Sequence, residues 1–394
     1  MARAIGWMTS LGLLACARPQ AVAVPAPAPL VVVAATPPAP APASPLAPVI
    51  VAANAITIAV APDPTYIERT DGAQLVNCDL VVRNTSAVAF TLSELEVSVF
   101  DRTGALVFRK FVSGNGVSPA ITTVPTRELA PATQALILNP LHTFPRDLDL
   151  AKLRFTVTYE ATAGTQQLTA TTEVAPRTFV GKARLALPLR DRLIAWSGHD
   201  FLSHHRRWDY VDPRIAGLGF DSNAARYSYD LIPVDARGDM RNGDAAINAS
   251  WFGFGRPVFA PAAGTIVAVT SDRPDDRQFD MAGLKTDLLV VYGNHIVVEH
   301  APGELSMLAH LKQHSVKVKV GDRVRAGQEL AAIGASGSSL MPHLHYQLQT
   351  TANGHAQGLP AYFHEFVKHG GSAPRVLARG HVDTGEIVES RAKR

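Results

Sequence analysis

Two histidines separated by one residue are the strongest constraint on the fold of this chain. Residues 342–345 read Pro-His-Leu-His, so His343 and His345 stand at positions i and i+2. On a β-strand these positions face the same side, because side chains alternate between the two faces. The pair can therefore share one metal ion, or one histidine can bind the ion while the other transfers protons. Zinc suits this chemistry, because neutral imidazole is a favoured zinc ligand and catalytic zinc sites keep one position open for water.

Several short motifs precede the histidine pair in a fixed order. They are Pro-Val-Phe-Ala-Pro at 257–261, Gly-Asn-His at 293–295, Ala-His-Leu at 309–311 and Val-Gly-Asp at 320–322. Together with the histidine pair they resemble the lysostaphin-like (LytM-type) zinc endopeptidases, which cut peptide cross-links of bacterial peptidoglycan. The resemblance covers roughly residues 225–365 and implies a mostly antiparallel β domain with an open groove and the site residues at its floor.

The resemblance also implies roles for four residues. Asp230 and His345 match the metal ligands, whereas His310 and His343 match two catalytic histidines that do not bind the metal. Zinc lowers the pKa of bound water to about 7. A nearby histidine can then accept the proton, and a second donor can stabilise the oxyanion of the tetrahedral intermediate.

One position departs from the family pattern. The family's first motif is His-x-x-x-Asp, with both residues on the metal, and the matching segment here runs from Arg226 to Asp230. Arginine stays charged and offers no acceptor, so Arg226 cannot be a ligand and instead is expected to pair with a carboxylate. We expect His205 or His204 to supply the missing ligand from an upstream loop. The alternative is that these two histidines belong to an exposed basic loop.

Three functions follow from these alternatives. The first is a zinc-dependent peptidoglycan endopeptidase, with Zn²⁺ as cofactor and peptidoglycan as substrate. If Arg226 neutralises Asp230, the protein is instead a degenerate, metal-free family member that binds peptidoglycan or activates cell-wall amidases. The third is a structural envelope lipoprotein. The 37 basic and 34 acidic residues give a net charge of +3, which is too mild to indicate a nucleic-acid partner.

The N-terminus predicts export. A basic start and an apolar stretch at residues 4–14 describe a signal peptide, and this stretch is shorter than the about 20 residues of a membrane span. The stretch ends in Leu-Leu-Ala-Cys, so residues 1–18 are interpreted as a lipoprotein signal and lipobox with the lipid on Cys16; a plain signal peptide is the alternative. Ala17 resembles the sorting signal for the outer membrane of Gram-negative bacteria. The expected location is therefore the cell envelope, anchored by lipid to the periplasmic face of the outer membrane.

The rest of the chain is expected to be all-β. Residues 19–49 form a Pro/Ala-rich linker, residues 50–176 an immunoglobulin-like β-sandwich, and residues 177–394 the lysostaphin-like peptidase domain. The sandwich would position the peptidase domain, bind a partner or act as a folded spacer. Cys78 within it is expected to be a buried, unpaired small hydrophobe.

Short apolar runs predict the strands of the C-terminal region. They lie at 265–270, 288–292, 296–299, 316–320, 329–333 and 345–348. The tail after Phe366 carries mixed charge and is expected on the surface or in partial disorder.

Overall fold

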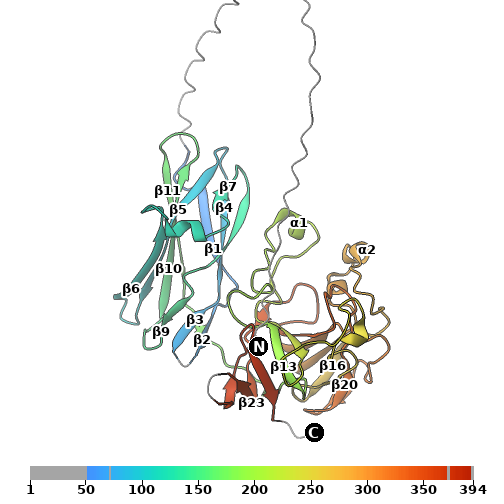
Figure 1. Ribbon diagram of the computed structural model, residues 1–394. Coiled ribbons are helices and arrows are strands. Elements are labelled where there is room, and N and C mark those ends of the chain that lie inside the picture. The colour runs from blue at the N-terminus through green and yellow to red at the C-terminus, as the bar shows by residue number, and fades with distance from the viewer. Residues whose placement is uncertain (1–50, 71, 371–372, 392–394) are drawn as a thin grey trace, which may run out of the picture. The chain divides into compact units, whose positions relative to one another are not determined.

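The computed structural model describes residues 51–70, 72–370 and 373–391, and strands dominate it (Figure 1). Helices make up 6% and strands 41% of the described residues, which confirms the all-β prediction. The signal peptide, lipobox and linker that were predicted for residues 1–49 lie outside the described residues. Within the described ranges, no helix is both long and apolar enough to cross a membrane. Pro48–Arg394 forms one compact unit, so the boundary predicted after residue 176 stays a prediction.

The N-terminal strands form three small sheets. The first contains β1 (Ile56–Ala61), β4 (Asp79–Asn84) and β8 (Gln134–Leu138). The second contains β5 (Phe90–Phe100), β6 (Leu106–Ser113), β7 (Glu128–Leu129), β10 (Lys152–Ala161) and β11 (Gln167–Val174). The third contains β2 (Tyr66–Arg69), β3 (Ala73–Val76), β9 (Thr143–Pro145) and β12 (Arg177–Thr178). A 3₁₀ turn, η1, covers Ala120–Thr123.

Alternating side chains build the core of this region. Val97 on β5 lies opposite Phe155 on β10, and both belong to one buried apolar cluster with Leu80 and Val82 of β4. Because every second residue points inward, each strand contributes one apolar face to that core. Cys78 is buried there, and no disulfide partner for it occurs among the residues that the structure describes. The immunoglobulin-like arrangement of the strands stays a prediction.

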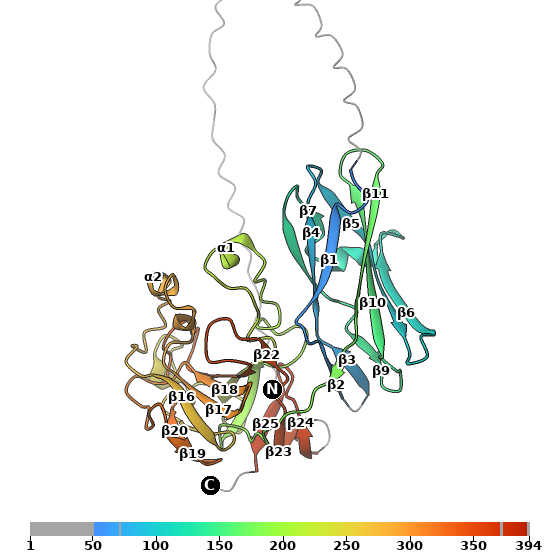
Figure 2. The ribbon, with the colours of Figure 1, turned by 180° about the vertical axis from the view of Figure 1, so that it is seen from behind.

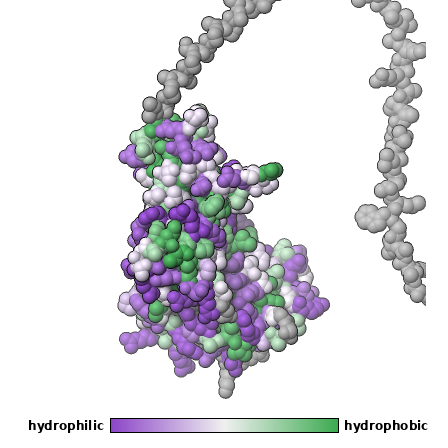
Figure 3. Space-filling view, turned by 90° about the vertical axis from the view of Figure 1, so that its left-hand side faces the viewer, coloured by the Kyte–Doolittle hydropathy of each residue, from purple (hydrophilic) through white to green (hydrophobic). Residues whose placement is uncertain are grey.

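One edge strand of this region exposes apolar side chains. β6 lies at the end of the β11–β10–β5–β6 order, and Leu106, Val107 and Phe111 on it are exposed. Figure 3 faces the side of Figure 1 on which β6 lies and shows an apolar patch surrounded by hydrophilic residues.

The C-terminal strands form one long sheet, seen from behind in Figure 2. Its order is β19 (Arg323–Val324), β16 (Gly264–Thr270), β17 (His295–Ala301), β18 (Glu304–Ala309), β21 (Leu344–Gln349), β14 (Tyr229–Pro233), β13 (Arg192–Ser197), β25 (Ile387–Ser390), β23 (Phe363–His369) and β24 (Arg375–Gly380), with β22 (Gly358–Leu359) beside β21. A separate pair joins β15 (Pro257–Phe259) to β20 (Glu329–Ala332). Neighbouring strands of the long sheet run antiparallel, as expected. The helical turns are α1 (Pro213–Ala216), α2 (Met281–Leu284), η2 (Asn248–Ser250) and η3 (Leu288–Tyr292).

Two of the strand predictions are wrong. Leu288–Tyr292 is a 3₁₀ helix, because the Asp287 carboxylate accepts a hydrogen bond from the Leu289 amide at 2.9 Å and caps the turn. Residues 316–320 form no strand. The Asp322 carboxylate accepts a hydrogen bond from the Lys319 amide at 2.9 Å, and the segment ends in a turn.

The surface position predicted for the tail is confirmed by the largely exposed β24, but the described tail residues form strands and not a partly disordered segment. After Phe366 the chain continues through β23 and forms β24 and β25, and β25 inserts between β13 and β23. β24 is an edge strand with mostly exposed side chains, so its sequence shows no apolar alternation by which it could be recognised.

Candidate metal centre

Strand register brings the site residues together. Asp230 on β14 lies directly opposite His345 on β21, and His345 lies opposite Ala309 on β18. His310 follows Ala309 at the strand end, and His343 precedes the first residue of β21. The structure therefore gathers the four residues that the resemblance singled out. Asp230, His310, His343 and His345 are all at least nine-tenths buried.

Three imidazole nitrogens face the same carboxylate oxygen. Asp230 Oδ1 lies 2.9 Å from His205 Nε2, 3.1 Å from His345 Nδ1 and 3.3 Å from His343 Nε2. Burial by itself would raise the pKa of Asp230, but His205 and His343 hold it well below its usual range. Asp230 is therefore an anion that several histidines surround.

A chain of amides fixes the protonation of His345. Gln349 Nε2 lies 2.6 Å from the Thr351 carbonyl oxygen, which can only accept a hydrogen bond. The other atom of the Gln349 amide is then the oxygen, so it accepts from Gln347 Nε2. This leaves Gln347 Oε1 facing His345 Nε2 at 2.8 Å, and His345 must donate that hydrogen bond. A neutral His345 therefore carries its proton on Nε2 and has a lone pair on Nδ1.

The orientation of His345 fits a bound cation. In the neutral form its Nδ1 lone pair faces an anionic oxygen at 3.1 Å, and two lone pairs in contact repel each other unless a cation, either a proton or a metal ion, lies between them. Two ligands at about 2.0–2.2 Å from a tetrahedral zinc lie roughly 3.3–3.6 Å apart, only slightly farther than the separations from Asp230 Oδ1. One carboxylate with neutral imidazoles is also a donor set that zinc accepts. The residues present therefore fit zinc.

Within the part of the chain that the structure describes, no backbone carbonyl accepts a hydrogen bond from Nε2 of His310 or His343. His310 donates from Nδ1 to the Ser336 carbonyl at 2.8 Å, and His343 donates from Nδ1 to the Met341 carbonyl at 2.7 Å. Burial, with His343 close by, lowers the pKa of His310 well below its usual value. Burial would also lower the pKa of His343, but the Asp230 carboxylate raises it. One histidine is thus kept neutral and the other is biased toward its cation.

The loop before α1 brings two more histidines to Asp230. His204, His205 and Asp230 offer ligand atoms that lie within 4.8 Å of one another. His205 is the nearer and less exposed of the two, since His204 Nε2 is 3.7 Å from Asp230 Oδ2 and its side chain is 55% exposed, against 17% for His205. Burial lowers the pKa of His205 to about 4, which keeps it in the neutral form that binds metals.

Arg226 turns away from this cluster. Its Nη1 atom pairs with Asp79 Oδ2 at 2.6 Å, so it does not neutralise Asp230. The carboxylate expected for Arg226 therefore comes from β4 of the N-terminal region. Sequence reasoning missed Asp79, Gln347 and Gln349. The two glutamines alternate with His345 along β21, which is a signal for a shared face, whereas no signal links Asp79 to Arg226.

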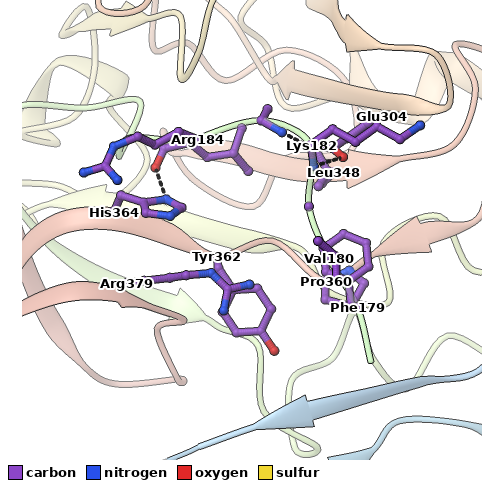
Figure 4. A pocket seen from close by; sticks show the side chains of 13 residues that line it. Phe179, Val180, Lys182, Arg184, Glu304, Leu348, Pro360, Tyr362, His364 and Arg379 are labelled. Carbon is purple, nitrogen blue, oxygen red and sulfur yellow. Dashed lines mark hydrogen bonds between the residues drawn. The ribbon is translucent and has the colours of Figure 1, made fainter. Parts of the chain in front are cut away.

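A cavity of about 380 Å³ lies outside the histidine cluster. Figure 4 shows aromatic and cationic side chains around it, among them Phe179, Tyr362 and Arg379. His364 Nδ1 lies 3.3 Å from the Leu185 carbonyl on its wall. None of the residues that surround Asp230 lines this cavity.

An antiparallel sheet that holds one carboxylate and several histidines at the ends of adjacent strands defines a metallopeptidase-type domain. Residues 250–357 match Peptidase family M23. His310, His343 and His345 lie inside the matched segment, whereas Asp230, His204 and His205 precede it. The lipoprotein NlpD of Yersinia enterocolitica is 30% identical over 95 residues, which are 24% of this chain and 78% of NlpD. The chain belongs to peptidase family M23 and carries its LytM-type domain.

Other relatives match shorter stretches. The murein hydrolase activator EnvC of Escherichia coli K12 is 40% identical over 63 residues, which are 16% of this chain and 15% of EnvC. The DD-carboxypeptidase/endopeptidase Mpg of Neisseria meningitidis is 38% identical over 56 residues, which are 14% of this chain and 12% of Mpg. The chain thus spans less than a sixth of these two relatives.

Solved structures of two peptidases show a weaker likeness. The catalytic domain of lysostaphin from Staphylococcus simulans is 26% identical, with a TM-score of 0.20 over 31% of this chain and 86% of that one. A zinc-containing peptidase from Vibrio cholerae is 13% identical, with a TM-score of 0.26 over 75% of this chain and 84% of that one. At these scores the likeness adds nothing to the assignment.

Proposed function

We propose that this protein is a zinc-dependent endopeptidase that cleaves peptide cross-links of peptidoglycan in the bacterial cell envelope. The observation that carries the proposal is the approach of His205 Nε2 and His345 Nδ1 to Asp230 Oδ1, at 2.9 and 3.1 Å. The amide chain holds the His345 Nε2–H on Gln347, so a neutral His345 directs its Nδ1 lone pair at that oxygen, where a metal ion can be bound by both atoms.

Three residues would hold the zinc in this proposal. They are Asp230, His345 and His205, and this set matches catalytic zinc sites, which combine three protein ligands with an open position. Bound zinc supplies a Lewis acid that polarises a carbonyl and makes a water molecule acidic near neutral pH. Gln347 orients His345 by accepting its Nε2 proton at 2.8 Å.

His310 and His343 divide the proton chemistry. His310 is neutral and its Nε2 lone pair is free, so it can accept the proton of the attacking water. His343 donates from Nδ1 to the Met341 carbonyl, so in its protonated form its Nε2–H can donate to the oxygen that becomes negative as the peptide carbonyl is attacked. Their ring centroids lie 4.7 Å apart, which supports a shared role at one reacting group.

We further propose that the protein reaches the envelope as a lipoprotein, with its lipid on Cys16 and its folded part at the periplasmic face of the outer membrane. The Leu-Leu-Ala-Cys sequence supports this, and one relative is named a lipoprotein. Cys16→Ser should move the protein from the membrane fraction to the soluble fraction. Unchanged fractionation would contradict the anchor.

Two observations favour a second function. Arg226 replaces the family's first ligand, and the chain is similar to a protein named murein hydrolase activator. In this reading the domain binds no metal and stimulates cell-wall amidases. Stimulation of a purified amidase by a zinc-free sample of the chain would support this second function, and also separate it from a purely structural lipoprotein.

Digestion of cross-linked peptidoglycan tests the main proposal. The wild-type chain with zinc should release new amino termini, and mass spectrometry should locate them in the cross-links. His343→Ala should keep its zinc, because it removes a proton donor and not a ligand. The rate of peptidoglycan cleavage by His343→Ala should be about 10²–10⁴-fold lower than that of wild type. Equal digestion by both proteins would exclude His343 from catalysis, and no digestion by wild type would exclude the endopeptidase.

A further inference from the structure

Asp79 is a buried carboxylate that faces two arginines. Arg226 Nη1 lies 2.6 Å from Asp79 Oδ2, and Arg206 Nη1 lies 2.7 Å from Asp79 Oδ1. All three side chains are at most 1% exposed. Arg206 also donates from Nη2 to the Cys78 carbonyl at 3.1 Å, so it contacts both Asp79, the first residue of β4, and the residue before it.

The charges in this triad do not balance. One carboxylate serves two guanidinium groups, and Arg206 Nε and Arg226 Nη2 have no hydrogen-bond partner among the described residues. A buried, incompletely paired charge is a cost to the folded state. Removing either arginine leaves one carboxylate with one guanidinium, so the triad contains more charge than stability requires.

Arg206 follows His205 directly in the sequence. The two neighbouring side chains leave one turn in different directions, with His205 Nε2 reaching Asp230 at 2.9 Å and Arg206 reaching Asp79 at 2.7 Å. The Asn223 side chain donates to the His205 carbonyl at 3.0 Å and steadies the backbone of the same turn. A fixed Arg206 therefore restricts where the His205 ring can lie.

Asp79 also explains how the family pattern can be altered at position 226. The Asp79 carboxylate pairs with Arg226, which stands where the family has its first metal ligand. The same carboxylate pairs with Arg206, which follows His205, the histidine that approaches Asp230 instead of residue 226. We infer that Asp79 of the N-terminal β region is a positioning residue for the metal centre, because it pins His205 through Arg206. This inference rests on the proposed zinc site, and it gives the N-terminal region a part in assembling that site.

A matched pair of substitutions in the full chain tests the inference. Arg206→Met and Arg226→Met remove the same group from the same triad, and each leaves a balanced ion pair with Asp79. Only Arg206→Met releases the turn that carries His205. Competition with a chromophoric zinc chelator should show at least tenfold weaker zinc binding for Arg206→Met, and binding within about threefold of wild type for Arg226→Met.

Stability is measured separately, by denaturant unfolding of the zinc-free proteins. Leu80→Ala, which removes a core side chain from β4, is the control: it should lower stability but leave the zinc affinity of the folded protein unchanged. If Arg206→Met does not fold, Arg206→Lys and Arg226→Lys replace the pair, and only the first should weaken zinc binding.

The outcomes separate the inference from the proposed function. Equal zinc affinity in the two arginine variants, or weaker binding in the Leu80→Ala control, would overturn the positioning role while the zinc site stands. Absence of zinc from wild type under the same conditions would overturn the proposed site, and the positioning role with it.

Discussion

Asp230 and His345 lie opposite each other on adjacent antiparallel strands, with His345 Nδ1 3.1 Å from Asp230 Oδ1. This register brings the buried side chains of Asp230 and His345 into contact. The orientation of the imidazole depends on a third residue, Gln347 on the strand of His345, whose Oε1 accepts a hydrogen bond from His345 Nε2.

The first prediction concerns Gln347. Gln347→Met removes the acceptor but keeps a side chain of similar size, so His345 can move its proton to Nδ1 and zinc must compete with it. Zinc affinity should fall by about 10–100-fold, as for other partners of metal-bound histidines. Gln347→Glu keeps an acceptor and should stay within a few fold of wild type. Nitrogen NMR of the zinc-free proteins should show the proton of His345 on Nε2 in wild type and in Gln347→Glu, but not in Gln347→Met. Identical spectra for the three proteins would contradict the role of Gln347 in fixing the His345 proton.

The second prediction separates the two upstream histidines. His205→Ala should abolish zinc binding at micromolar concentrations, because two ligands alone hold zinc weakly. His204→Ala should weaken binding by less than fivefold, since its side chain is 55% exposed and lies 3.7 Å from Asp230. Isothermal titration of the two variants measures this difference. A larger loss of zinc affinity in His204→Ala than in His205→Ala would mean that His204, and not His205, is the ligand.

The third prediction concerns the backbone beside the site. Gly293 has φ 59° and ψ −132°, and a Cβ there would lie 2.5 Å from the Ser336 carbonyl carbon. Gly293→Ala should lower the free energy of unfolding by about 3 kcal/mol or more, from strain and overlap together. Gly303→Ala is the matched control, since its φ is 75° but nothing lies within 4 Å, and it should cost about 1 kcal/mol. Urea unfolding of both variants measures the difference; equal losses would contradict the close approach.

The sequence predicted the parts of the site that depend on local patterns. The spacing of His343 and His345 placed both near one face, and the family motif placed Asp230 and His310 with them. The all-β class followed in the same way from short alternating runs. The strand predicted at Leu288–Tyr292 is wrong because Asp287 caps this apolar run as a 3₁₀ helix.

The remaining parts depend on contacts between distant segments. Asp79 precedes Arg226 by 147 positions, and nothing in either segment marks their pairing. From the sequence, either His204 or His205 could replace the missing ligand. The sequence could not rank them, because the path of the loop decides which of the two side chains reaches Asp230. In the structure His205 is the nearer one to Asp230.

Zinc content tests the central claim most directly. The full chain, purified without metal chelators and dialysed gently, is measured by elemental analysis before and after treatment with a chelator and re-addition of zinc. The account predicts one zinc per chain, lost on chelation and recovered on re-addition, and about one zinc in His343→Ala but none in His205→Ala. A wild-type protein without stoichiometric zinc, even after zinc is added, would contradict it.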